Sequence, residues 1–144
     1  MTHAELVERA AKWVRRHDRN LYVPNCSLVL AELVTAAGET PDVIGFGHGS
    51  SVLVECKTSR ADFLRDKNKR FRIYPDQGMG QQRLYLADPG VVEPEDLPRH
   101  WGLLRPSARG CVMIVQPDRQ EYNHQAEAMI LLSLLRRHEI TGKP

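Results

Sequence analysis

Two short β-type runs on either side of a glycine-rich tetrapeptide constrain the fold of this chain more than any other feature. The runs are 41–46 and 51–57, and the tetrapeptide Gly-His-Gly-Ser occupies 47–50. Glycine readily takes the positive φ that a tight turn demands. The sequence therefore predicts a β-hairpin closed by a four-residue loop.

The loop length also predicts which residues face each other across the hairpin. If Phe46 faces Ser51, then counting outward places Asp42 opposite Glu55. Directly opposite residues have Cβ atoms about 4.5–5.5 Å apart. Strand alternation puts Lys57 on the same face as Glu55. We therefore expect two carboxylates and one ammonium group to share a small volume.

Two carboxylates that face each other need a compensating positive charge, because like charges directly opposite destabilise a sheet. Mg²⁺ suits this place, since it binds one or two carboxylates and completes its shell with waters and substrate phosphates. Asp42, Glu55 and Lys57 with such an ion are the parts that phosphodiester hydrolysis requires. The other interpretation is a solvated edge hairpin in which the acids and Lys57 form a plain salt bridge.

The remaining pattern predicts an α/β protein with a mixed central sheet flanked by helices. Thr2 and Glu5 form a capping-box pattern at the start of an amphipathic helix. The predicted order is α-β-β-β-α-β-β-β-α, and residues 1–144 are expected to form a single domain. Outside the hairpin, we predict helices over 3–17, 61–69 and 122–138 and strands over 28–34, 83–87, 102–105 and 111–115.

Composition places the chain among globular proteins and indicates no membrane association. Its 144 residues are 42% hydrophobic and 26% charged. No apolar run approaches the roughly 20 residues that a bilayer span needs. Three cysteines are too few for a disulfide framework, so we expect a cytoplasmic protein. The net charge is only +2, but residues 55–72 carry a local excess of +4, which fits either a phosphate backbone or a solvated helix face.

The hairpin motif resembles the signature of the PD-(D/E)XK nuclease superfamily, with Pro-Asp at 41–42 and Glu-Cys-Lys at 55–57. The match over about residues 26–137 is closest to the MmcB-like DNA-repair proteins and related small phage and bacterial nuclease-like proteins. The segments that carry it are the run 55–67, Gly-Met-Gly at 78–80, Arg-Leu-Tyr-Leu at 83–86, Glu-Asp-Leu-Pro at 95–98 and Trp-Gly-Leu-Leu at 101–104.

This resemblance implies a restriction-endonuclease-like core and a Mg²⁺-dependent nuclease that acts on DNA, with Mn²⁺ able to substitute. Asp42 and Glu55 would be metal ligands, together with the backbone carbonyl of Cys56, and Lys57 would be the catalytic lysine. Members of the superfamily often add a further acid. Glu32 is the choice here, because its strand is expected beside Asp42.

Glu5 and Glu8 are the alternatives to Glu32 as the further acid. Under the nuclease interpretation, the cations that follow Lys57 along the predicted helix contact the DNA. These cations are Arg65, Lys67, Lys69 and Arg70.

Three further hypotheses accompany the nuclease interpretation. The same fold could serve as a catalytically inactive module that binds nucleic acid or a protein partner. Hydrolysis of RNA or of a nucleotide second messenger is a weaker alternative. Finally, the last helix is apolar over a wider arc than a small sheet needs, so part of 131–135 is predicted to lie in a homodimer interface.

Overall fold

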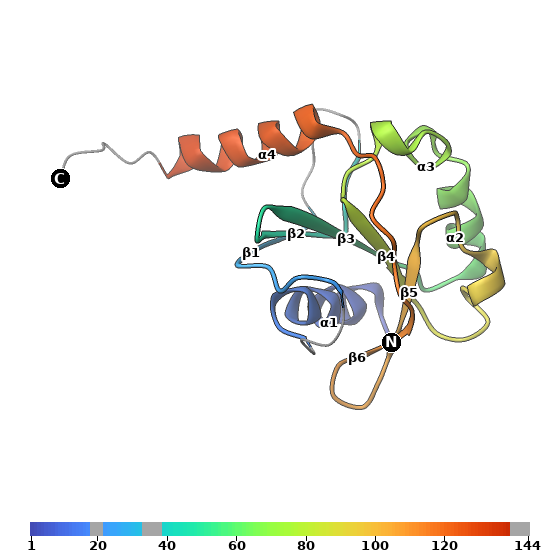
Figure 1. Ribbon diagram of the computed structural model, residues 1–144. Helices are drawn as coiled ribbons and strands as arrows, with labels where there is room; N and C mark the ends of the chain where they lie inside the picture. The colour runs from blue at the N-terminus through green and yellow to red at the C-terminus, as the bar shows by residue number, and fades with distance from the viewer. Residues whose placement is uncertain (18–21, 33–38, 139–144) are drawn as a thin grey trace.

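The computed structural model describes residues 1–17, 22–32 and 39–138. Figure 1 shows a central sheet with helices on both of its faces. The helices are α1 (His3–Arg15), α2 (Arg60–Lys67), α3 (Arg70–Ile73) and α4 (His124–Arg137), and the 3₁₀ turns are η1 (Pro75–Gln77) and η2 (Pro94–Asp96). The strands are β1 (Leu28–Ala31), β2 (Val43–Gly47), β3 (Ser50–Cys56), β4 (Gln82–Leu86), β5 (Gly102–Pro106) and β6 (Cys111–Val115). The predicted mixed α/β fold is confirmed.

The strands of the described residues form one sheet in their order along the chain, from β1 to β6. The β1–β2, β2–β3 and β5–β6 pairs are antiparallel, whereas β4 runs parallel to both β3 and β5. A parallel pair needs a crossover connection, and α2 and α3 form the one between β3 and β4. The carboxyl ends of β3 and β4 therefore lie at the same edge, where α/β sheets commonly place their ligands.

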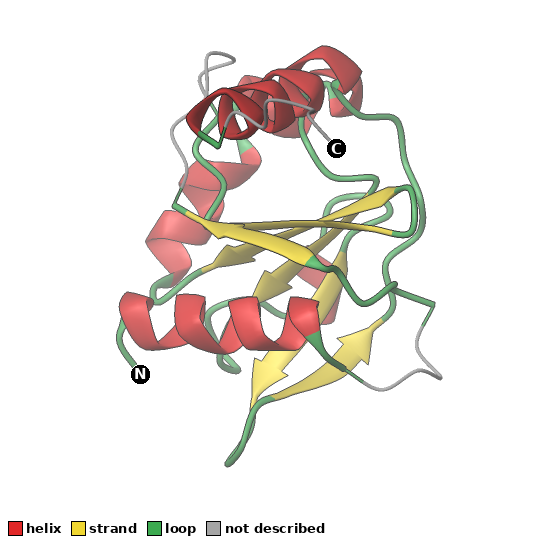
Figure 2. Ribbon diagram, turned by 90° about the vertical axis from the view of Figure 1, so that its left-hand side faces the viewer, coloured by secondary structure: helices red, strands yellow, loops and turns green. Residues whose placement is uncertain are grey.

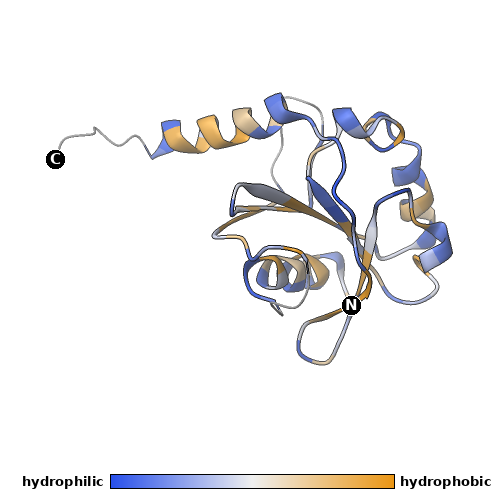
Figure 3. Ribbon diagram, viewed as in Figure 1, coloured by the Kyte–Doolittle hydropathy of each residue, from blue (hydrophilic) through white to orange (hydrophobic). Residues whose placement is uncertain are grey.

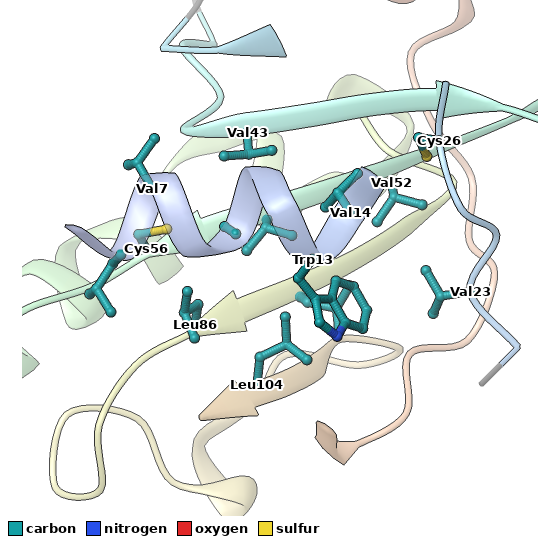
Figure 4. Close-up of a cluster of buried hydrophobic side chains, with 14 residues drawn as sticks. Val7, Trp13, Val14, Val23, Cys26, Val43, Val52, Cys56, Leu86 and Leu104 are labelled. Carbon is teal, nitrogen blue, oxygen red and sulfur yellow. The ribbon is translucent and has the colours of Figure 1, made fainter. Parts of the chain in front are cut away.

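Helix α1 covers one face of the sheet (Figure 2). The predicted capping box forms, with the Glu5 N–H donating to Thr2 Oγ1 and the Thr2 N–H donating to Glu5 Oε2. Figure 4 shows the apolar side chains between this helix and the strands. Gly45 allows their close approach, because a Cβ there would lie 2.4 Å from Val14 Cγ1.

The other face of the sheet packs against α2 and α4, with Phe63 and Ile130 in a shared core. Tyr85 stacks on Trp101 there, with ring centroids 4.4 Å apart. Helix α4 extends past the edge of the sheet (Figure 1), and apolar residues continue along its free part (Figure 3). Its large exposed apolar side chains are Met129, Leu132 and Leu135.

The hairpin has the predicted register but a shorter turn. Gly47 pairs with Ser50, so a two-residue turn of His48 and Gly49 replaces the predicted four-residue loop. Both turn residues have positive φ, 53° and 70°, as a tight hairpin turn requires. The predicted loop length was wrong, but it left the pairing unchanged because Gly47 and Ser50 simply extend the ladder.

Two further element boundaries differ from the prediction. Strand β1 ends at Ala31, and Glu32 leaves the strand with a φ of 54°; residues 33 and 34 of the predicted strand lie outside the described residues. The helix predicted over 61–69 ends at Lys67, and α3 starts after a break. In the ranges that the structure describes, no helix has the length and apolarity to cross a membrane.

Candidate active site

The β2–β3 hairpin brings Asp42 and Glu55 together as the sequence predicts. Val43 pairs with Val54 and Ile44 with Leu53, which confirms the predicted register. Asp42 and Glu55 are the next residues outward, where the β2–β3 ladder ends. The negative charge of Asp42 acts on Glu55 and raises the pKa of that carboxyl. The two acids therefore share one electrostatic environment.

Asp42 is held by the backbone of the opposite strand and by the first helix. Its Oδ2 accepts a hydrogen bond of 2.8 Å from the Cys56 N–H. Its Oδ1 lies 3.3 Å from Nε2 of His3, whose Nδ1 lies 3.6 Å from Oε1 of Glu32. The Glu32 N–H donates to the Asp42 carbonyl. Glu32 is thus beside Asp42, but its side chain is 60% exposed and pairs with His3.

Glu55 points into a buried cluster with Arg72 at its centre. Arg72 Nη2 lies 3.1 Å from Glu55 Oε1, Nη1 lies 2.8 Å from Glu39 Oε2, and Nε lies 3.0 Å from Asp66 Oδ2. Each guanidinium nitrogen therefore meets a different carboxylate. All four side chains are at most 6% exposed. We call Arg72, Glu39, Glu55 and Asp66 the Arg72 cluster.

Aromatic rings and backbone hold the Arg72 cluster in place. The guanidinium carbon of Arg72 lies 4.8 Å from the centroid of the Trp101 ring, within cation–π range. The Tyr85 hydroxyl donates to Asp66 Oδ2, and the Met79 N–H donates to Glu39 Oε1 at 2.9 Å. The Gly-Met-Gly segment at 78–80 is thereby joined to the cluster.

Lys57 is placed next to the cluster by its position directly after β3. Its Nζ lies 3.5 Å from Asp66 Oδ1, and Lys69 Nζ lies at the same distance from that oxygen. Asp66 Oδ1 is buried and accepts no hydrogen bond. The ammonium group of Lys57 is therefore held by an acid on α2 and not by Glu55, the acid two residues before it.

Burial and neighbouring opposite charges shift the pKa values of Glu55, Asp66 and Arg72 in opposite directions. Burial raises the pKa of Glu55 well above its ordinary value, and Arg72 only partly offsets this effect. Burial also opposes the charged form of Asp66, but Arg72 and Lys57 outweigh it and lower the pKa of Asp66. Burial disfavours the charged guanidinium of Arg72 too, yet Glu55, Asp66 and Glu39 raise its pKa above the ordinary value. The cluster therefore keeps its central cation.

The cations predicted to contact DNA lie on two short helices and not on one continuous face. Arg65 pairs with Asp62 on α2, and Lys67 Nζ lies 5.5 Å from the Phe63 ring centroid. The other two cations follow the break after α2. Lys69 is the N-cap of α3 and Arg70 is its exposed first residue. The helix predicted over 61–69 ends at Lys67, and residues 61–69 contain no glycine or proline to mark that end.

Sequence reasoning missed several residues of this site. Arg72 and Asp66 were counted only as charges of a basic segment, and Glu39 carried no local signal at all. His3 joins Asp42 from a helix that begins far away in the sequence. The sequence does not show that Asp66 is the partner of Lys57, because the helix after Lys57 contains several other charged residues. Long-range pairing of charged side chains leaves no periodic trace in a sequence.

The acids at the hairpin end are of the chemical type that binds hard divalent cations. Asp42 and Glu55 offer carboxylate oxygens, the ligand type that Mg²⁺ prefers. The described part of the chain has no group of three or more His, Cys, Asp or Glu side chains arranged to hold a metal ion. A cation at this end would therefore have only this pair of carboxylates among the described side chains, and Mg²⁺ commonly takes one or two carboxylates from a protein.

These features define a mixed α/β protein with a cluster of acids, arginine and lysine at the carboxyl end of a parallel strand pair. No protein-family model matches the chain, and no curated protein matches it. Among solved structures, the chain is similar to a protein of unknown function from Silicibacter pomeroyi, at 22% sequence identity and a TM-score of 0.61. The similarity covers 100% of this chain and 97% of that one, and it supports the fold.

Proposed function

We propose that this chain is a Mg²⁺-dependent phosphodiesterase that hydrolyses DNA, with Asp42, Glu55 and Lys57 at its centre. The observation that carries the proposal is the register of the β2–β3 hairpin, which puts the two acids next to each other where the ladder ends. Lys57 follows directly after β3, and its ammonium nitrogen lies 3.5 Å from Asp66 Oδ1 in the Arg72 cluster, which also holds Glu55. This arrangement combines cation-binding oxygens with a positive charge for the transition state.

In the proposed reaction, Asp42 and Glu55 hold the cation together with the carbonyl of Cys56. When bound, the cation supplies Lewis-acid polarisation of a phosphoryl oxygen and activation of water. Lys57 neutralises negative charge that develops on the phosphate. Asp66 restricts the orientations of Lys57, because its buried oxygen lies 3.5 Å from the ammonium nitrogen. Glu32 remains a proposed further acid that acts beside Asp42.

DNA is the proposed substrate because cations lie close together along the chain, in the last turn of α2 and at the start of α3. Lys69 is half exposed and Arg70 is exposed, which leaves both able to contact a phosphate backbone. Arg65 and Lys67 lie on the preceding helix. The same chemistry would serve RNA or a nucleotide second messenger, so the substrate panel in the test below includes both.

A second candidate function is a nucleic-acid-binding or partner-binding module without catalysis. The observation that favours it is the ion pair between Glu55 and Arg72, which already neutralises a proposed metal ligand. Asp42 Oδ2 is likewise engaged by the Cys56 N–H. Under this hypothesis the acids are structural, and the exposed cations bind the partner.

The two candidates are separated by cleavage assays on a fluorescently labelled DNA duplex with Mg²⁺ or Mn²⁺, alongside single-stranded DNA, RNA and a cyclic dinucleotide. The variants are Asp42→Asn, Glu55→Gln and Lys57→Ala, with Glu95→Gln as the control because Glu95 is an exposed acid. We expect cleavage by the parent and the control only, with each site variant losing at least a hundredfold in rate. Cleavage by all three variants at the parent rate would refute the catalytic assignment.

A further inference from the structure

Three buried carboxylates converge on the guanidinium of Arg72, which takes the position that a bound cation would take among them. Glu39 precedes β2, Glu55 is the next-to-last residue of β3 and Asp66 lies on α2, so three separate segments each direct one carboxylate at it. Its three nitrogens lie 2.8–3.1 Å from oxygens of these acids. A guanidinium group whose three nitrogens each contact a carboxylate is a strongly held counter-ion.

Arg72 and a divalent cation would compete for the negative charge of Glu55, because two cations at one carboxylate repel each other. We propose that Arg72 competes with the divalent cation for Glu55. In the observed arrangement Arg72 neutralises the acids of the cluster, and metal binding requires Arg72 to release Glu55. This inference rests on the proposed function and adds a mode of regulation to the same site. A site of this kind binds metal more weakly than its acids alone would.

Two features of the cluster support this exchange. Asp66 Oδ1 is buried, makes no hydrogen bond and lies 3.5 Å from the ammonium nitrogens of both Lys57 and Lys69, so Asp66 keeps compensating cations when the guanidinium moves. Arg72 itself belongs to a four-residue helix, α3, whose N-cap makes no side-chain capping hydrogen bond. The arginine is thus carried by a short element and not by the sheet that positions Glu55.

Calorimetric titration with MnCl₂ in the absence of nucleic acid tests this inference on the full chain. The variants are Arg72→Gln, which removes the charge, and Arg72→Lys, which keeps a charge but loses the fork. Arg60→Gln is the matched control, because Arg60 pairs with Asp96 away from the cluster. We expect Mn²⁺ affinity to rise at least tenfold in Arg72→Gln and by a smaller factor in Arg72→Lys, with no change in the control. Glu55→Gln added to Arg72→Gln should abolish the gain.

Arg72→Gln leaves three acids without their central cation, so its folding must be measured together with binding. Thermal melting with and without Mn²⁺ supplies that readout, and we expect Mn²⁺ to raise the melting temperature of this variant more than that of the parent. If Arg72→Gln stays unfolded at every Mn²⁺ concentration, Arg72→Lys decides the question. An affinity in that variant equal to the parent's would overturn the inference.

The outcomes also separate this inference from the proposed function. Equal Mn²⁺ affinity in the parent and in both Arg72 variants refutes competition by Arg72 but leaves metal-dependent cleavage standing. Absence of Mn²⁺ binding in all of them refutes competition as well, and absence of DNA cleavage by the parent then removes the proposed function too.

Discussion

Replacing Glu55 by glutamine keeps the shape of the side chain and removes a charge that burial disfavours. Burial raises the pKa of Glu55 in the folded chain well above its value in the unfolded chain. A carboxyl with a raised folded-state pKa makes the folded state bind more protons, so stability falls as the pH rises from the unfolded to the folded pKa. Glu55→Gln does not titrate, so we expect this variant to escape that loss.

The size of the effect follows from the position of Glu55 in the cluster. Each unit by which the folded-state pKa of Glu55 exceeds its unfolded-state pKa lowers the free energy of unfolding by about 1.4 kcal/mol, once the pH has passed both values. Removing one partner of a buried ion pair normally costs about 3–5 kcal/mol, because it leaves a buried charge unpaired. Arg72 keeps Glu39 and Asp66 as partners, so this cost is largely avoided here. Relative to the parent, Glu55→Gln should gain stability over the pH range from about 4.5 upward, by about 1.4 kcal/mol for each pH unit until the folded-state pKa of Glu55 is reached.

Urea denaturation across this pH range, with a chelator present, measures the difference. For each pH unit, the gain corresponds to about 3–6 °C in melting temperature for a chain of this length. Glu95→Gln, at an exposed acid, is the control and should follow the parent at every pH. A difference between Glu55→Gln and the parent that stays constant with pH would contradict the electrostatic account of the cluster.

Three further changes test the packing of the fold. Gly45→Ala should destabilise the chain by about 1–3 kcal/mol in urea denaturation, because its Cβ would lie under 3 Å from Val14 and Cys26; Gly110→Ala, with no atom within 4 Å, should be nearly neutral. Ser59→Ala should cost about 1 kcal/mol in the same assay, since the Ser59 hydroxyl accepts the Asp62 N–H at the start of α2. Leu132→Glu should convert the predicted homodimer to a monomer in light scattering, and a monomeric parent at micromolar concentration would contradict the dimer.

The hairpin register could be predicted from sequence because a strand has a strict two-residue period. A turn two residues shorter than predicted therefore changed no pairing, since Gly47 and Ser50 continue the same ladder. The capping box at Thr2 was equally readable, because both of its hydrogen bonds are local. Where the physics is local, the sequence pattern was sufficient.

The Arg72 cluster could not be predicted in this way. Glu39 and Arg72 are 33 residues apart, and their contact depends on how α3 returns to the sheet. A charged residue that becomes buried has no periodic signature, and Arg72 stands in the sequence as one cation among many. The same limit hid the partner of Lys57, which is Asp66 on the following helix.

The most direct test of this account is to soak crystals of the parent protein with Mn²⁺ and to measure its anomalous scattering. The account predicts an anomalous peak between the carboxylates of Asp42 and Glu55, with the Arg72 guanidinium moved away from Glu55. A Mn²⁺-soaked crystal that keeps the Glu55–Arg72 ion pair and has no peak at these acids would contradict the central claim.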